Sequence, residues 1–357
     1  MKAMLHTDVN KSRGSRGDWG NWGRFMQKCR GAKVQVRKAT RLLPLASCLL
    51  PLALFGCTQP SANRSMSGGE NKPQVVATST ILADLTQRVG RDEIQLRGIL
   101  KPGADPHVYE PVPADSQVLE EADLILYNGY NLEPGLIKLM NAAGLKGRKL
   151  PVGEVVKSLQ LDKGSEVVPD PHVWGDVKNS IEMVNRIRDA LIELSPEDKE
   201  KFTQNAARLT GELKQLDTWI TKEIQTIPAD KRKLITTHDA FQYYGRGYGI
   251  AIAGTLIGIS TEEQPSAQTV QRLVEAVKKA GVPTIFAETT INPALITTVA
   301  QEAGVKLAPR QLYSDSIGSP GSEGDSYIKM MESNTRTIVE ALGGKYTPLQ
   351  AAGTPKK

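Results

Sequence analysis

Two of the four histidines in this 357-residue chain occur in the same short frame. The stretch DPHVY at residues 105–109 returns as DPHVW at residues 170–174. Proline fixes its own backbone and restricts the residue before it, so His107 and His172 are each presented from a stiffened loop. Imidazole is a common ligand of zinc, copper, iron and nickel, and a preorganised metal site needs ligands held in this way. The repeated frame therefore indicates metal-binding chemistry.

A third histidine, His238, ends the strand-like run KLITTHD at residues 233–239. Functional groups in open α/β sheets collect at the carboxyl ends of strands. A carboxylate could complete the ligand set, and Asp315 in LYSDSIG (312–318) is the first candidate. Glu288 also ends a strand-like run and fits equally well on local grounds. Further competitors are Asp105, Asp170 and Asp239.

Asp239 directly follows His238, so the two side chains should point in different directions. We therefore expect Asp239 to support the ligands from behind rather than to bind the ion, and we assign Glu288 the same supporting role if Asp315 is the ligand. Spacing alone puts Asp315 only narrowly ahead of Glu288.

The elements around these residues alternate between short β-branched runs and helical stretches. Strands are predicted at 74–80, 94–100, 122–129, 233–239, 250–258, 284–290 and 306–313. Helices are predicted at 81–90, 266–281 and 292–304, each with an apolar stripe and a closing glycine. Alternating strands and helices predict α/β architecture with parallel sheets, and the chain contains two such sets.

The segment between the two sets is the most periodic in the chain. Apolar residues recur every three or four positions from Phe202 to Ile227. Ser195 is a candidate N-cap, Pro196 suits the first helical position, and Pro228 ends the pattern. About thirty residues at 1.5 Å each predict a helix of roughly 45 Å, which would be a stiff connection between the two halves.

The net charge of +6 is unevenly distributed. Residues 1–56 contain 11 Lys and Arg against 2 Asp and Glu, whereas residues 58–357 contain 34 against 37. The basic character therefore belongs to the amino-terminal segment, and we expect no nucleic-acid partner.

That segment ends in fifteen mostly apolar residues, 42–56, behind a basic stretch. The run is short for a membrane span and has the length and flanks of a secretory signal core. The run ends in the box LFGC (54–57), which resembles a bacterial lipoprotein cleavage site in which Cys57 would carry the lipid. Cys29 and Cys48 would leave with the signal peptide, so the mature chain should contain no disulfide.

Taken together, the motifs KPGADPHVYEP, PDPHVW, TTHDAFQYYGRGYG and LYSDSIG, with EGDSYIKMM after them, resemble those of a known family. It comprises the metal-binding lipoproteins of bacterial ABC importers for manganese, zinc and iron (solute-binding protein family 9). The similarity runs from about Gln74 to Tyr346. The resemblance implies two α/β lobes bridged by one rigid helix, with the metal between them. It also implies His107 and His172 as ligands from the first lobe, and His238 and Asp315 from the second.

This resemblance sets the expected organisation of the chain. We expect a signal peptide over 1–56, a lipidated flexible tether over 57–73, an N-terminal lobe over 74–194, a bridging helix over 195–228, a C-terminal lobe over 229–346 and a flexible tail over 347–357. Each lobe should contain a mainly parallel sheet flanked by helices. The resemblance implies a monomer without enzymatic activity, lipid-anchored at the periplasmic or cell-surface side of the membrane, that delivers its ion to a permease driven by an ATPase.

The choice of metal rests on conflicting indications. Three nitrogens and one carboxylate favour zinc over manganese in intrinsic affinity. Zinc-dedicated members of the family usually carry a His-rich loop between the first two histidines, and residues 108–171 contain no histidine. Many manganese-specific members have Glu where His238 stands, although some with three histidines are associated with manganese. We place manganese slightly ahead of zinc, with iron third.

Three other functions compete with metal import. A binding protein for an organic solute would use aromatic and Arg residues in its cleft, and the chain is only 5% aromatic. A secreted zinc hydrolase would keep one metal position open for water, whereas four protein donors close a tetrahedral shell. An adhesin is suggested by the lipid anchor alone.

Overall fold

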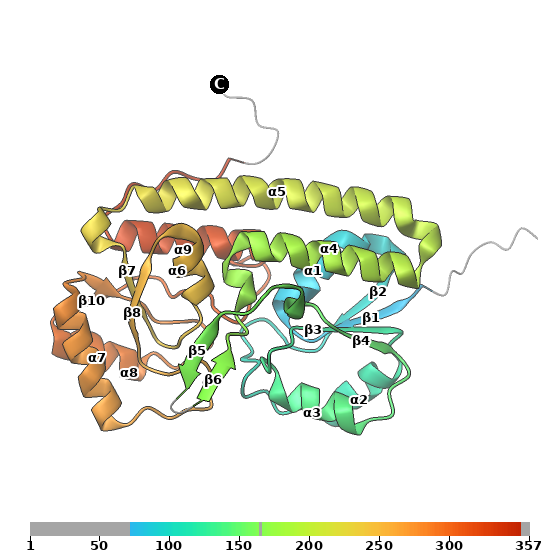
Figure 1. Cartoon of the computed structure of the whole chain (residues 1–357), viewed down its shortest axis with the longest axis horizontal. Coiled ribbons are helices and arrows are strands. Elements are labelled where there is room, and N and C mark those ends of the chain that lie inside the picture. Colours follow the sequence, from blue (N-terminus) through green and yellow to red (C-terminus); the bar gives the residue numbers. More distant parts are fainter. Residues whose placement is uncertain (1–71, 164–165, 351–357) are drawn as a thin grey trace, which may run out of the picture. The chain divides into compact units, whose positions relative to one another are not determined.

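The computed structural model describes residues 72–163 and 166–350 (Figure 1). The predicted signal core and Cys57 lie outside these residues. Within them, no helix combines the length and the apolar character needed to cross a membrane.

The first lobe is built on a four-stranded parallel sheet. Its strands lie in the order β2-β1-β3-β4. Their bounds are β1 (Gln74–Ala77), β2 (Gln95–Gly98), β3 (Leu124–Tyr127) and β4 (Arg148–Pro151). Both central strands are almost continuously apolar, as expected for parallel strands that are covered on both faces.

Helices cover the two faces of this sheet. Val75 and Ala77 pack on the side of α1 (Thr80–Gly90) and α4 (Val177–Leu194). Val76 points the other way and packs with α2 (Pro113–Glu120) and α3 (Pro134–Ala142). The side-chain alternation of one strand thus contributes to two separate apolar layers.

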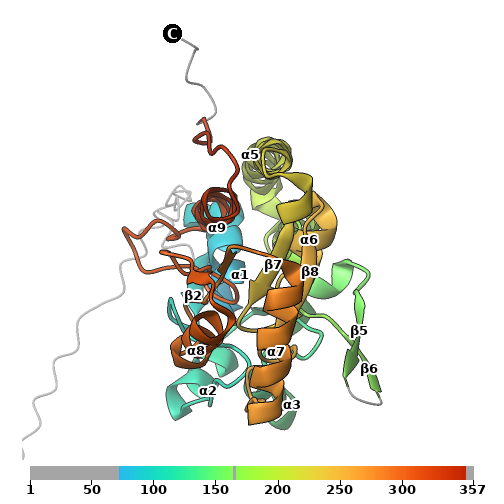
Figure 2. The same ribbon diagram turned by 90° about the vertical axis from the view of Figure 1, so that its left-hand side faces the viewer.

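An antiparallel hairpin interrupts the parallel pattern. It consists of β5 (Gln160–Lys163) and β6 (Glu166–Pro169), and it leads into the short helix η3 (Val173–Gly175). The hairpin stands to one side of the two layers (Figure 2). This hairpin was not predicted from the sequence.

The second lobe repeats the parallel arrangement. β7 (Lys233–Thr236) pairs with β8 (Ala251–Thr255), and β9 (Thr284–Ile285) pairs with β10 (Lys306–Leu307). A hydrogen bond from Phe286 N to Ile235 O, 2.9 Å long, joins the two pairs.

The helices of the second lobe cover both sides of these strands. α7 (Ala267–Ala280) and α8 (Ala294–Ala303) share one apolar cluster with Ile235 and Ile285. α6 (Gln242–Tyr248) and α9 (Tyr327–Ala341) contribute to the large cluster that also contains α1 and α4.

One long helix, α5 (Lys199–Gln225), crosses both lobes and packs against α1, α4 and α9 (Figure 1). The short turn η4 (Pro196–Asp198) precedes it, and the hydroxyl of Ser195 donates a hydrogen bond to Asp198. Its 27 residues span about 40 Å. Its apolar stripe is fully buried and consists of Phe202, Ala206, Leu209, Leu213, Leu216, Ile220 and Ile224. The chain therefore has the expected fold of two α/β lobes bridged by a helix.

Candidate metal centre

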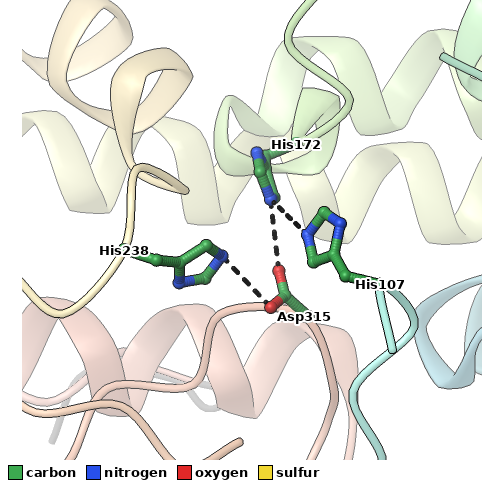
Figure 3. A group of neighbouring side chains, drawn as sticks. All are labelled: His107, His172, His238 and Asp315. Carbon is green, nitrogen blue, oxygen red and sulfur yellow. Dashed lines mark hydrogen bonds and ion pairs between the residues drawn. The ribbon is translucent and has the colours of Figure 1, made fainter. Parts of the chain in front are cut away.

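Four predicted ligands converge at the carboxyl ends of strands from both lobes. His107 follows β2, and His172 lies between β6 and α4. His238 follows β7, and Asp315 lies beyond β10. Figure 3 shows the four side chains directed toward a common point, each from a different segment. All four are buried, with at most 3% of their surface exposed.

The donor atoms of these side chains lie at short distances from one another. His107 Nε2 is 3.2 Å from His172 Nε2, and His172 Nε2 is 3.4 Å from Asp315 Oδ1. His238 Nε2 is 3.2 Å from Asp315 Oδ2. One donor from each of the four residues fits within a group whose members are all within 4.8 Å of one another.

These separations fit a single small ion. A tetrahedral metal with bonds of about 2.0–2.1 Å holds its donors roughly 3.3 Å apart. The oxygens of Asp315 and Nε2 of His238 are buried and make no hydrogen bond within the described residues, although Oδ2 of Asp315 lies close to His238 and Oδ1 close to His172. Buried polar atoms without hydrogen bonds are costly, and a cation between them would satisfy them.

The repeated Asp-Pro-His frame has a local structural role. Oδ1 of Asp105 accepts a hydrogen bond from His107 N, 2.9 Å away, and Oδ1 of Asp170 accepts one from His172 N, 3.0 Å away. Each aspartate thus closes a small turn that fixes the backbone of the histidine two residues later.

The two aspartates differ in their other contacts. Oδ1 of Asp170 also lies 2.7 Å from Nδ1 of His172, which orients that ring with Nε2 toward the cluster. Oδ2 of Asp105 instead accepts a hydrogen bond of 2.7 Å from Thr261 in the second lobe. From the sequence, Asp170 is only a competing ligand, and this orienting contact was not predicted. The separation of two residues in Asp-Pro-His was the signal that could have suggested it.

A carboxylate also orients His238. One oxygen of Glu288 accepts a hydrogen bond of 2.8 Å from His238 N, and the other contacts Nδ1 of the same ring. The carboxylate of Asp239 accepts a hydrogen bond from Gln242 Nε2 and lies outside these contacts. Glu288 therefore orients His238 through its backbone N–H and ring Nδ1, whereas Asp239 is hydrogen-bonded to a residue of α6.

The electrostatics of the cluster favour a cation. Burial by itself would raise the pKa of Asp315, but the neighbouring His238, with His172 and His107, holds that pKa well below its usual range. Burial would lower the pKa of His238, and here the opposing charges of Glu288 and Asp315 prevail and raise it well above its usual value. The cluster thus keeps a buried carboxylate ionised and attracts positive charge to His238.

A small cavity of about 190 Å³ lies beside His107. Its lining includes Tyr130, Pro171, Ile259 and Glu262. This is below the 300–1,000 Å³ typical of sites for drug-sized organic ligands.

With this geometry established, comparisons with known proteins assign the family. Residues 75–341 match the family described as ZnuA, zinc-uptake complex component A, periplasmic. The chain belongs to the ZnuA family. This ZnuA-family chain is 35% identical over 298 residues to the manganese ABC transporter substrate-binding lipoprotein PsaA of Streptococcus mitis, covering 82% of this chain and 95% of the relative.

Solved structures support the same assignment. The periplasmic zinc-binding protein TroA from Treponema pallidum is similar with a TM-score of 0.72 and 33% identity, covering 76% of this chain and 99% of TroA. The Fe(III)-bound YtgA from Chlamydia trachomatis has a TM-score of 0.69 and 27% identity, covering 77% of this chain and 99% of YtgA. The ZnuA-family chain thus shares its fold with proteins whose names refer to zinc and to iron.

Proposed function

We propose that this protein binds one divalent transition-metal ion outside the cytoplasm and delivers it to an ABC permease for import. His107, His172, His238 and Asp315 are the ligands, and Cys57 carries the lipid that anchors the protein to the membrane. Glu288 supports His238 from behind. The permease and its ATPase supply the transport step, and this chain itself is a binding component without enzymatic activity.

The observation that carries this proposal is the spacing of the donor atoms. Three contacts of 3.2–3.4 Å link three imidazoles and one carboxylate in a buried cluster. That is the distance at which a metal ion of zinc-like size separates its ligands.

The transported ion is manganese or zinc, and we favour manganese. The donor set of three nitrogens and one oxygen binds zinc more tightly by the Irving–Williams order. Metal supply can override this intrinsic preference, and PsaA, a relative at 35% identity, is named for manganese.

The experiment that tests the proposal is elemental analysis of protein purified from its native host, followed by titration of the metal-free protein. The Trp174 ring lies 5.5 Å from the His172 ring, so its fluorescence should report binding. We expect one equivalent of manganese or zinc to saturate the change, and a His172→Ala chain to lose it. A wild-type chain that responds to amino acids or sugars and not to metals would contradict the proposal.

A further inference from the structure

The loop that carries Asp315 belongs in sequence to the second lobe, but beyond Ser314 it is hydrogen-bonded to the first. Ser316 Oγ accepts a hydrogen bond of 2.8 Å from Gly103 N and lies 3.0 Å from Thr80 Oγ1 in a shared hydrogen bond. Ile317 N donates to the same Thr80 hydroxyl over 3.1 Å. Gly103 has a φ of +83°, a conformation that favours glycine, and this turn presents its N–H to Ser316.

The other side of Asp315 is held by a second contact with the first lobe. Trp174 Nε1 donates a hydrogen bond of 3.0 Å to Ser314 O. Trp174 lies two residues after His172, and Gly103 lies four residues before His107. The residues on both sides of Asp315 are therefore hydrogen-bonded directly to the loops that carry the two histidines of the first lobe.

These contacts continue at the start of α9. Tyr327 N donates to Asp84 Oδ2 over 3.0 Å, and the Tyr327 hydroxyl donates to Trp174 O over 2.6 Å. The loop that carries Asp315 contacts its own lobe mainly upstream of Asp315, where Leu312 N donates a hydrogen bond to Ala287 O.

His238 has a different set of partners. Its N–H and its ring both contact Glu288, and its carbonyl accepts a hydrogen bond of 2.8 Å from Thr236. Both partners belong to the second lobe. The links from this part of the second lobe to the first are made by residues more distant in sequence. The Tyr243 hydroxyl donates to Asp170 O over 3.1 Å, and the Thr261 hydroxyl donates to Asp105 over 2.7 Å.

We propose that His107, His172 and Asp315 form one preassembled unit that stays together without metal, and that His238 alone withdraws when the ion is released. Ser316 and Trp174 are the positioning residues of this unit. The inference rests on the proposed function, because it assigns the moving part of the same site. The ion would leave through a state in which three protein ligands still bind it. Only the bond to His238 would break first, whereas separation of both second-lobe ligands would break two bonds together.

Hydrogen exchange of the wild-type protein tests the preassembly directly. The amide hydrogens of Gly103 and Ile317 are donated between the lobes, so we expect equal protection in excess chelator and in saturating zinc. Exchange of both at the rate of an open loop, with protection only after zinc is added, would overturn the inference.

A mutational cycle then tests which ligand Ser316 serves. In the wild-type background, Ser316→Ala should weaken zinc binding about 10–100-fold, the range for removing a group that orients a ligand. The same factor should persist in a His238→Ala background and vanish in an Asp315→Ala background. An equal effect in the Asp315→Ala background would mean that Ser316 supports the fold in general. Loss of the effect in the His238→Ala background would mean that Ser316 positions His238 and not Asp315, which would contradict the inference.

Two controls accompany the cycle. Ser319→Ala removes an exposed hydroxyl from the same loop and should leave zinc affinity unchanged. Ser316→Thr keeps a hydroxyl and should recover much of the affinity. Failure of the proposed function would appear separately, as a wild-type chain that binds no metal before any substitution is made.

Discussion

Oδ1 of Asp170 contacts His172 twice, accepting a hydrogen bond from its backbone N–H at 3.0 Å and lying 2.7 Å from its ring Nδ1. One oxygen thus fixes both the backbone and the ring of the histidine. The arrangement leaves Nε2 as the free donor directed at Asp315 and His107. A single aspartate two residues upstream therefore sets the direction of a proposed ligand.

Asp170→Asn should weaken zinc binding about 10–100-fold, because an amide provides a weaker acceptor for the ring N–H and removes a charge. Asp239→Asn is the matched control, since that carboxylate is hydrogen-bonded to Gln242 and should matter little. Competition with a coloured zinc chelator measures both. Equal losses in the two variants would contradict the assignment of Asp170 as the orienting residue.

Thr261→Val should speed zinc dissociation several-fold. The Thr261 hydroxyl donates a 2.7 Å hydrogen bond across the lobes to Asp105, whose other oxygen fixes His107 N. Valine has nearly the same shape and cannot donate, whereas Thr261→Ser keeps the donor and serves as the control. Stopped-flow release into excess chelator gives the rates, and an unchanged rate in Thr261→Val would show that this contact does not restrain the ion.

Glu133 should make the metal-free protein less stable as pH rises. Burial raises its pKa to about 7 from an ordinary 4.5, even though Asn128 N and the Thr78 hydroxyl donate hydrogen bonds to the carboxylate. Between these two pH values the folded chain holds a proton that the unfolded chain has lost. Stability therefore falls across this window by about 3 kcal/mol and stays lower above pH 7.

The substitution Glu133→Gln isolates this effect. Glutamine keeps the accepting oxygen and cannot ionise, so urea unfolding at pH 5 and pH 8 in chelator should show a smaller pH dependence than the wild type. Glu120→Gln changes an exposed glutamate of α2 and should leave the dependence as it is. Identical pH dependence in wild type and Glu133→Gln would mean that another group is responsible.

Leu213→Ala should destabilise the protein by about 2–5 kcal/mol, because its side chain is fully buried in the middle of α5. Lys214→Ala, at the next and exposed position, should change stability by less than about 0.5 kcal/mol. Thermal or urea unfolding of the metal-free chains gives both values. A small effect of Leu213→Ala would show that α5 is only loosely packed on the two lobes.

Local sequence patterns predicted the repeating elements well. The strand-like and helical runs around β1, α1, β7, α7 and α8 lie within a few residues of the observed elements, because buried parallel strands and amphipathic helices have strong periodic signatures. The predicted strands at 284–290 and 306–313 are longer than β9 and β10, since the chain leaves the regular ladder early and keeps only an isolated pairing of Glu288 with Leu312.

Other parts of the molecule had no such signature. The β5–β6 hairpin is short, and β6 is at least partly exposed at every residue, so it lacks the continuous apolar run that marks a buried strand. Residue type and strand position identified the three histidines as candidate ligands. The resemblance to a family, and not the spacing, separated Asp315 from Glu288.

Contacts between distant segments could not be predicted at all. Ser316 and Thr80 are 236 residues apart, and nothing local distinguishes Ser316 from Ser314 or Ser319. Only the folded chain shows that the Ser316 hydroxyl bridges the lobes.

The distribution of donors over the chain limits how the protein could be divided. A fragment ending with α4 would contain two of the four proposed ligands, both histidines, and a fragment beginning after α5 would contain the other two, one histidine and one aspartate. Two such halves, made as separate polypeptides, would have to associate before all four ligands could bind the ion. The ion would then hold the halves together, and its binding would report their association.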